Sequence, residues 1–438
     1  MGSRHPWHDF LLRVLWHGGS TFDAWLNISS AKMASRLLTM PQSTTQMGLP
    51  SAIVYQLFQG GMGAWVQHVI GILFLKYRLH HQSGASDRTR FTTTTQLHEV
   101  IGGHLGPRWR AVSFVLNIVC VFYVCSLQLV ACSNIVYNLN RTLDKRTWTS
   151  VFTAVFSLTI FIPNAHNYRI WSFLGVITTT YVAGYLVVAT LAHEKVAGVK
   201  YTTPHSYEEY FTGLSGLTIL GHVVVPVEIM DAMWKPQEFS MANAYSVIYI
   251  LLVTMIPTIS MNRRFGDILL KHPNALSLLP SSKFRDTAII LLLVHLFINF
   301  GMYSLAVYAM WEKLLRVHDS PSYGKKILSR VPVFLAFWLT ALAFPFFGII
   351  SKILDATFII WNFYVIPCAA YNLVFWSRTV QQQSKSLSTF GWVTDFSLNL
   401  GVILWVVIVE CGLALWGDMV SLLSLKDDLR LFAKCYNC

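Results

Sequence analysis

The chain has 438 residues, of which 54% are hydrophobic and only 12% are charged, and its formal net charge is +12. This composition excludes a set of soluble domains and is typical of a protein that crosses a bilayer many times. A nucleic-acid-binding protein is also excluded, because the cations are spread over many loops and form no stripe with interleaved aromatic residues. The excess of Lys and Arg is better explained by attraction to anionic lipid and by a role in setting the orientation of the chain in the membrane.

Uncharged stretches long enough to cross a bilayer as helices, which takes about 20 residues, recur along the whole sequence. The first, at 37–75, is long enough for two helices with a turn near 48–50. Together they predict an all-α polytopic membrane protein with about eleven transmembrane helices. We expect residues 1–21 as a cytoplasmic N-terminus, 22–418 as a single transmembrane domain and 419–438 as an extracellular tail. The remaining predicted spans are 111–140, 147–168, 170–193, 210–227, 239–262, 287–311, 331–351, 356–377 and 392–418.

The orientation follows from a small excess of Lys and Arg in the loops that lie inside when the N-terminus is cytoplasmic. Asn140-Arg141-Thr142 is a glycosylation sequon in a loop that this orientation places outside, so Asn140 is a candidate glycosylation site. Cys435 and Cys438 lack the second ligand pair of a zinc site and can form a disulfide if the tail is outside.

Chemistry-bearing motifs of enzymes do not occur in the sequence. It has no phosphate-binding loop, no metal-ligand cluster and no nucleophile motif. We therefore expect no enzymatic activity and no cofactor.

Two predicted spans contain helix breakers near the middle of the bilayer. The first carries Pro41, and the sixth carries Gly221, three valines and Pro226. Proline removes a backbone donor, and irregular backbone at this depth is tolerated only where it is buried in protein or lines a cavity. Breaks five spans apart are typical of a five-plus-five inverted repeat, with the substrate bound between the broken helices.

The first span also holds two cations, Lys32 and Arg36, four residues apart. Each would cost about 2.5–3.5 kcal/mol at mid-bilayer if unpaired. Arg36, with the adjacent Ser35, lies at the expected break, where a guanidinium can bind a carboxylate bidentately. The alternative is that Arg36 pairs with Asp355 or Glu228 and binds no substrate. Lys32 is expected to extend to the cytoplasmic boundary.

His222 directly follows Gly221 at the second break, and histidine changes charge readily near physiological pH. We expect it to contact substrate and to couple transport to protons, although a lone membrane histidine can equally be a packing residue. Glu228 is a second candidate for proton coupling. Asp231 lies nearer the end of the span and can pair with Lys235.

Further polar side chains occupy the third and eighth spans. They either line the substrate cavity or join helices to one another, and the sequence does not distinguish these roles. Lys352 and Asp355 are three residues apart and predict an intrahelical salt bridge. The candidate substrate-binding residues in the two spans are Asn117, Gln128, His295 and Asn299.

Several long strings closely resemble plant auxin influx carriers of the amino acid/auxin permease family, including WHGGSTFDAW (16–25), LLTMPQSTTQMG (37–48), FIPNAHNYRIWSFLG (161–175), VEIMDAMWKPQEF (227–239) and FGDILLKHPNALSLLP (265–280). The resemblance implies a LeuT-like fold with helices one and six broken, a location in the plasma membrane, and proton-driven uptake of indole-3-acetic acid. It matches His222 to the histidine of the family's Gly-His motif. It also matches Asn117, Gln128 and His295 to family positions.

The chain departs from the family at the first break. Close members read Ser-Asn-Gln-Val-Ala-Gln-Val-Leu-Leu where residues 30–38 read SAKMASRLL, so two amides are lost and two cations gained. Asp231 stands where histidine is usual, and Lys352 and Asp355 enter an uncharged segment. Three hypotheses therefore stay open: an auxin importer with a rebuilt anion site, a permease for amino acids or other aromatic carboxylates, and a non-transporting paralogue that binds auxin or a partner and signals.

Overall fold

The computed structural model describes residues 19–33, 36–82, 95–137, 140, 142–162, 169–194, 199–201, 204–218, 223–272, 274–320, 322–343, 352–384 and 387–424, and every regular element in these ranges is a helix. The α-helices are α2 (Thr21–Met33), α3 (Arg36–Met47), α4 (Leu49–Gln82), α5 (Leu97–Leu105), α6 (Pro107–Tyr137), α7 (Lys145–Phe156), α8 (Arg169–Ala192), α9 (Tyr207–Thr218), α10 (Pro226–Ala232), α11 (Phe239–Phe265), α12 (Lys283–Leu314), α13 (Tyr323–Ala343), α15 (Ile366–Val374), α16 (Arg378–Gln383), α17 (Trp392–Trp405) and α18 (Leu415–Ser424).

Shorter helical turns complete these elements. They are the 3₁₀ segments η3 (Ser157–Phe161), η6 (Pro236–Glu238), η7 (Gly266–Lys271) and η8 (Ala275–Leu278), and the π-helical segments η9 (Asp355–Ile359), η10 (Trp361–Val365) and η12 (Val406–Ala414).

Eight continuous segments of the described chain are long and apolar enough to cross a membrane: 49–80, 107–137, 170–192, 236–271, 283–314, 323–343, 352–374 and 392–423. Three more are short or interrupted, namely α2 with α3, α7 with η3, and α9 with α10. The described part of the chain thus contains eleven candidate spans. The prediction of an all-α polytopic protein is confirmed, and the protein is a multi-pass membrane protein.

The first span extends beyond the uncharged stretch that begins at residue 37, and its interruption lies before Pro41. It starts at Thr21, because Asp23 and Lys32, whose charges interrupt the apolar stretch, are buried inside α2. Helix α2 ends at Met33 and α3 begins at Arg36, the residue expected at the break, and α3 continues through Pro41. Proline is accommodated in membrane helices where neighbouring helices supply other contacts. The expected turn into the second span is confirmed at Gly48, whose φ of 83° is one that glycine adopts without strain.

The sixth span is also broken, as predicted. Helix α9 ends at Thr218, and α10 starts with Pro226 at its first turn, where the missing N–H has no intrahelical partner to lose. Gly221 and His222 lie outside the described residues.

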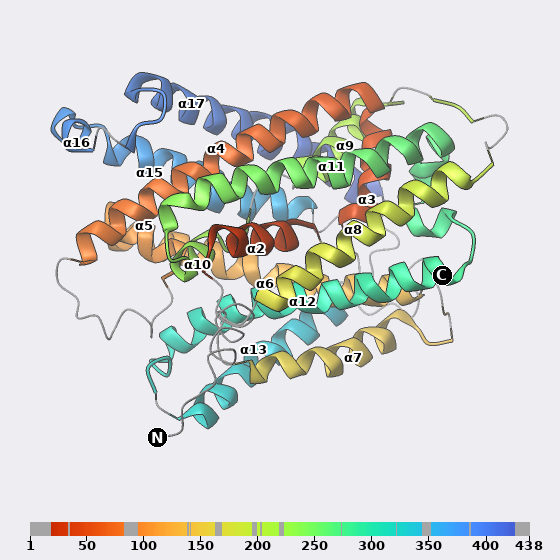
Figure 1. The fold of residues 1–438 in the computed structure, drawn as a ribbon, viewed down its shortest axis with the longest axis horizontal. Coiled ribbons are helices and arrows are strands. Elements are labelled where there is room, and N and C mark those ends of the chain that lie inside the picture. The colour runs from red at the N-terminus through yellow and green to blue at the C-terminus, as the bar shows by residue number, and fades with distance from the viewer. Residues whose placement is uncertain are drawn as a thin grey trace, which may run out of the picture.

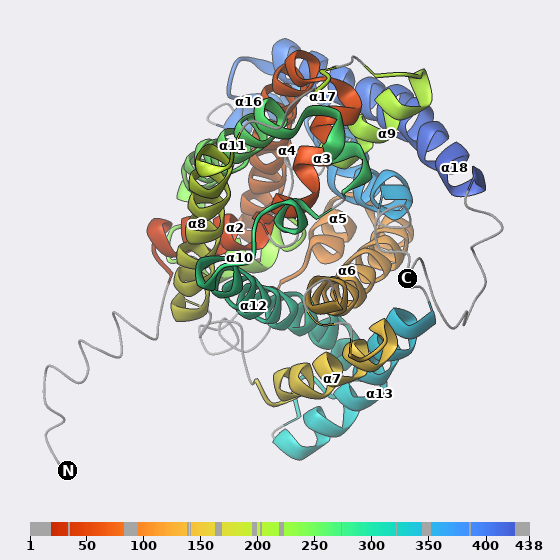
Figure 2. The same cartoon turned by 90° about the vertical axis from the view of Figure 1, so that its right-hand side faces the viewer.

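The broken helices lie inside the bundle. Figure 1 shows the short helix α2 in the middle of the molecule, between the long helices α11 and α8. In the view of Figure 2, α7 and α13 lie together at one edge, away from α2. Helix α3, the second half of the first span, packs against α9, the first half of the sixth. The two interrupted spans are therefore in direct contact.

Two glycines let α9 approach α3 closely. A Cβ atom at Gly213 would lie 2.8 Å from the backbone nitrogen of Met47, and one at Gly216 would lie 2.1 Å from the Oγ of Ser43. Any larger side chain at these positions must push the two half-helices apart.

Substituting valine for Gly213 should therefore lower the melting temperature of the purified protein, because overpacking typically costs about 1–3 kcal/mol. Gly61→Val on α4 is the matched control, since a Cβ there meets no atom within 4 Å. Thermal unfolding in detergent measures both. Equal melting temperatures for the two variants would contradict this packing.

Candidate functional site

The end of α2 at the first break is held by side chains of α12. The Nδ2 of Asn299 donates to the carbonyl of Ser30 at 3.2 Å, and the hydroxyl of Tyr303 donates to the carbonyl of Ala31 at 2.6 Å. The last four carbonyls of any helix lack an intrahelical partner. Helix α12 thus donates two hydrogen bonds to carbonyl groups in the last turn of α2.

His295 belongs to the same polar cluster. Its Nε2 lies 3.0 Å from the Nδ2 of Asn299, and the Oγ of Ser30 donates to the Oδ1 of Asn299 at 3.5 Å. The structure therefore brings the predicted residues His295 and Asn299 together with the first span. All three side chains are fully buried.

Gly175 of α8 closes this cluster from the other side. A Cβ atom there would lie 2.2 Å from the Oγ of Ser30 and 3.2 Å from the Nδ1 of His295. We did not predict Gly175 as a site residue. It stands at the end of the string FIPNAHNYRIWSFLG, whose close match to the family is the one signal that points to it.

Arg36 and Asp355 form a second group on the other half of the broken span. Arg36 is the first residue of α3, and its charge interacts with that of Asp355, which is buried at the start of η9. The hydroxyl of Tyr123 on α6 donates to the Oδ1 of Asp355. Of the two carboxylates expected as partners of Arg36, Asp355 is the one whose charge interacts with it in the described residues. A substrate carboxylate would have to share Arg36 with it.

Lys352 does not pair with Asp355, so the predicted intrahelical salt bridge is wrong. Its Nζ donates to the carbonyl of Thr212 at 2.9 Å, and its charge interacts with Asp418 of α18. Asp418 in turn accepts a hydrogen bond from Ser215 at 2.6 Å. Lys352 thus joins the tenth span to α9.

Lys32 does not extend to the cytoplasmic boundary as expected. It is only 2% exposed, and its Nζ donates to the Oδ1 of Asn243 on α11 at 3.2 Å. It also shares no helical face with Arg36, because α2 ends at Met33 and α3 begins at Arg36. The two cations therefore occupy separate environments on either side of the break.

Asn117 lies in a contact between α6 and the tenth span. Its Oδ1 accepts from the Nδ2 of Asn362 at 3.2 Å, and the Oγ of Ser113 donates to the Oδ1 of Asn362 at 3.3 Å. This is the joining role that polar side chains have between membrane helices. Gln128 is buried farther along α6, and its Oε1 makes no hydrogen bond with the described residues.

Glu228 lies in the first turn of α10, near an ionic group at the predicted cytoplasmic end. Its charge interacts with those of Lys313, Glu99 and Asp231. Lys313 lies 2.9 Å from Glu99, which places α5 and α12 in contact. Burial lowers the pKa of the neighbouring His98 to about 4, so that residue is neutral in the cytoplasmic range.

Asp231 accepts a hydrogen bond from the backbone of Thr95 at 3.0 Å, while Lys235 lies 3.5 Å from Glu238. Asp231 thus joins α10 to the residues that precede α5. Glu228 therefore lies near the contacts between α10 and α5. His295 lies in a different cluster, at the end of α2.

Some predicted residues are not tested. Ser35, Gly221, His222, Cys435 and Cys438 lie outside the described residues. Asn140 is exposed, and its Oδ1 accepts from the backbone of Thr142 at 2.9 Å, so its glycosylation stays a prediction. In the described ranges, no group of three His, Cys, Asp or Glu residues is placed to hold a metal ion.

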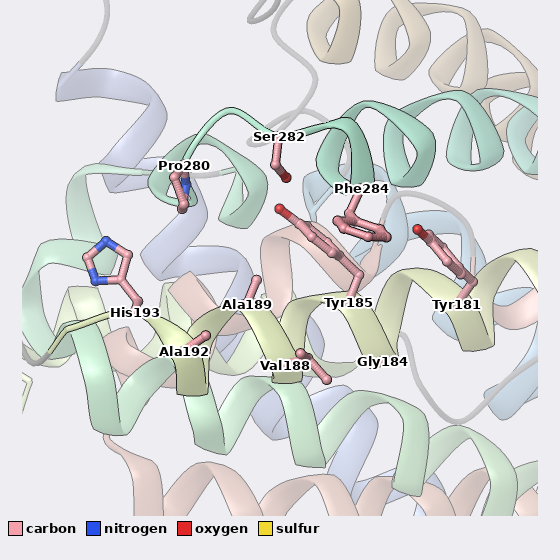
Figure 3. Close-up of a pocket in the computed structure, with 10 residues that line it drawn as sticks. All are labelled: Tyr181, Gly184, Tyr185, Val188, Ala189, Ala192, His193, Pro280, Ser282 and Phe284. Atoms are coloured by element: carbon pink, nitrogen blue, oxygen red, sulfur yellow. The ribbon is translucent and has the colours of Figure 1, made fainter.

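An apolar pocket of about 550 Å³ lies apart from the break, between α8 and the start of α12. Figure 3 shows Tyr181, Tyr185 and Phe284 around it, with His193 at one end. None of the predicted site residues lines it. We therefore assign the candidate substrate site to the break of the first span and not to this pocket.

The sequence matches the family model described as transmembrane amino acid transporter protein over residues 17–410. The chain belongs to this family. Within it, the chain is 41% identical to auxin transporter-like protein 3 of Arabidopsis thaliana, over 98% of this chain and 92% of that protein. It is likewise 41% identical to auxin transporter-like protein 5 of Medicago truncatula (98% and 88%), and 40% identical to auxin transporter protein 1 of Arabidopsis thaliana (98% and 89%). The resemblance to amino acid/auxin permeases is confirmed.

A solved structure supports the fold. The structure of MhsT in complex with L-phenylalanine superposes with a TM-score of 0.58, over 93% of this chain and 99% of that one, at 12% identity. The protein therefore has the LeuT-like fold, and the predicted five-plus-five architecture with broken helices one and six is confirmed.

Because Arg36 and Asp355 interact, removal of one charge should leave the other without compensation. We expect Arg36→Gln and Asp355→Asn each to lower the melting temperature, and the double variant to be more stable than the sum of the single effects by about 0.5–3 kcal/mol. Thermal unfolding of the four proteins completes the cycle. Strictly additive effects would show that the two charges are independent.

Proposed function

We propose that this chain is a proton-coupled secondary transporter that imports indole-3-acetic acid, or a similar aromatic carboxylate, across the plasma membrane. The names of its relatives support the substrate, since proteins 40–41% identical over nearly the whole chain are called auxin transporters. The observation that carries the proposal is the position of Arg36 at the first turn of α3, directly after the break.

A carboxylate is well matched to that position. The N-terminus of a helix presents free N–H groups and the positive end of the helix dipole, and α3 is 12 residues long. The Arg36 guanidinium adds a charge and a pair of parallel donors. The aromatic body would lie toward Tyr123 and Tyr303, both of which lie close enough to Arg36 to interact with its charge.

Movement of the substrate would come from one bundle of helices rocking against the other around this site. Asn299 and Tyr303 hold α2 to α12 and so keep the first half of the broken span in place. His222 at the second break is the proposed proton carrier, with Glu228 as the second candidate. Protonation must favour the substrate-competent state for coupling to occur.

A second candidate substrate is an amino acid. Asp355 beside Arg36 places a negative and a positive charge at one site, and a zwitterion presents the complementary pair. A monoanion such as indole-3-acetate would gain from Arg36 and be opposed by Asp355. The third hypothesis, a paralogue that binds auxin or a partner and signals, predicts no uptake by a chain that reaches the cell surface.

Uptake of labelled indole-3-acetic acid by cells expressing the full chain tests the proposal. We expect saturable uptake that rises at mildly acidic external pH and collapses with a proton uncoupler. His222→Ala should abolish it while surface protein is unchanged. Normal uptake by that variant would remove His222 from the mechanism, and no uptake by the unmodified chain at the surface would favour a changed substrate or a signalling role.

The charges at the break should also set selectivity. Arg36→Gln is expected to reduce uptake of indole-3-acetate at least about tenfold, since a charge-assisted hydrogen bond contributes about 1.5–3 kcal/mol. Asp355→Asn should favour the monoanion over tryptophan in a competition assay. Improved uptake of indole-3-acetate by Arg36→Gln would show instead that the cation opposes this substrate.

A further inference from the structure

Lys32 is a buried cation that takes no part in the proposed transport cycle. It lies in the last turn of α2, and its hydrogen bond to Asn243 is the one recorded for its ammonium group among the described residues. No ion pair joins it to a carboxylate in the part of the chain that the structure describes. The amine of a buried lysine without a carboxylate partner stays charged only where other groups supply negative potential.

That potential comes from the end of α2 itself. The carboxyl end of a helix carries about half a negative charge, and its last carbonyls have no partner within the helix. Asn299 and Tyr303 of α12 bond to the carbonyls of Ser30 and Ala31. Lys32 reaches instead to Asn243 of α11.

The junction between α2 and α11 is otherwise built of neutral polar groups. One turn before Lys32, the Oγ of Ser29 donates to the Oγ of Ser246 at 3.0 Å, and both residues are fully buried. Asn243 and Ser246 are three residues apart on α11, so they face α2 together. The junction thus presents the amide oxygen of Asn243 to a single positive charge that belongs to the last turn of α2.

In transporters with inverted repeats, unwound carbonyls and the carboxyl ends of half-helices are where a coupling cation binds. We propose that the ammonium group of Lys32 is the resident cation of the α2–α11 junction and takes the place of a bound alkali metal ion. The inference deepens the proposed function, because a tethered cation at this place leaves the proton as the ion that drives transport. Transport should then need no sodium.

The test uses purified full-length protein and needs no substrate, so its result is independent of whether the chain carries auxin. Melting temperatures are measured in sodium chloride, ethylammonium chloride and choline chloride at equal ionic strength. The unmodified chain should melt at the same temperature in all three. Lys32→Ala should melt lower in choline chloride and recover by a few degrees in sodium or ethylammonium chloride, because both small cations can enter the space that the side chain leaves.

Lys32→Met is the matched control, since its side chain fills the space without a charge and should show no cation-specific shift. Lys283→Ala, at the exposed start of α12, controls for general effects of removing a lysine. A sodium-specific rise in the melting temperature of the unmodified chain would overturn the proposal even if Lys32→Ala fails to fold. So would a Lys32→Ala variant that folds and responds equally to all three salts.

Discussion

The structure depends on one constraint: a helix that breaks inside a bilayer exposes backbone groups that water cannot reach, so side chains of neighbouring helices must bond to them. At the end of α2, the side chains of Asn299 and Tyr303 on α12 donate hydrogen bonds to the carbonyls of Ser30 and Ala31. Gly175 makes room for the cluster by letting α8 approach. The half-helix is thereby fixed from two sides, and the start of α3 is left as a place where an anion can bind.

The two cations of the first span, Lys32 and Arg36, are placed on opposite sides of that break. Arg36 interacts with Asp355 across to the tenth span, whereas Lys32 bonds to Asn243 of α11 and has no carboxylate partner among the described residues. The positive charge of each residue therefore interacts with a different group. A chain can accept two cations at this depth because they do not share one face of one helix, as they would if the span were continuous.

The sequence was sufficient to predict the class of fold, the number of spans and the interruption of the first and sixth spans, because these features follow from apolar length and from residues that interrupt a helix locally. It was insufficient where the outcome depends on packing. Pro41 was expected to break the first span and lies inside a helix. Lys32 was expected to reach the membrane boundary and is buried. Lys352 was expected to pair with Asp355 and bonds to the carbonyl of Thr212. The interhelical role of Asn117 and the fit of Gly175 against Ser30 also depend on contacts between segments far apart in the chain.

The central claim is that substrate binds at the break of the first span, with its carboxylate at Arg36 and the start of α3. An experimental structure of the protein with indole-3-acetic acid bound tests it most directly. We predict ligand density between the first, third and eighth spans, with the carboxylate within hydrogen-bond distance of the Arg36 guanidinium. Ligand density in the apolar pocket between α8 and α12 (Figure 3), with the break empty, would contradict the account.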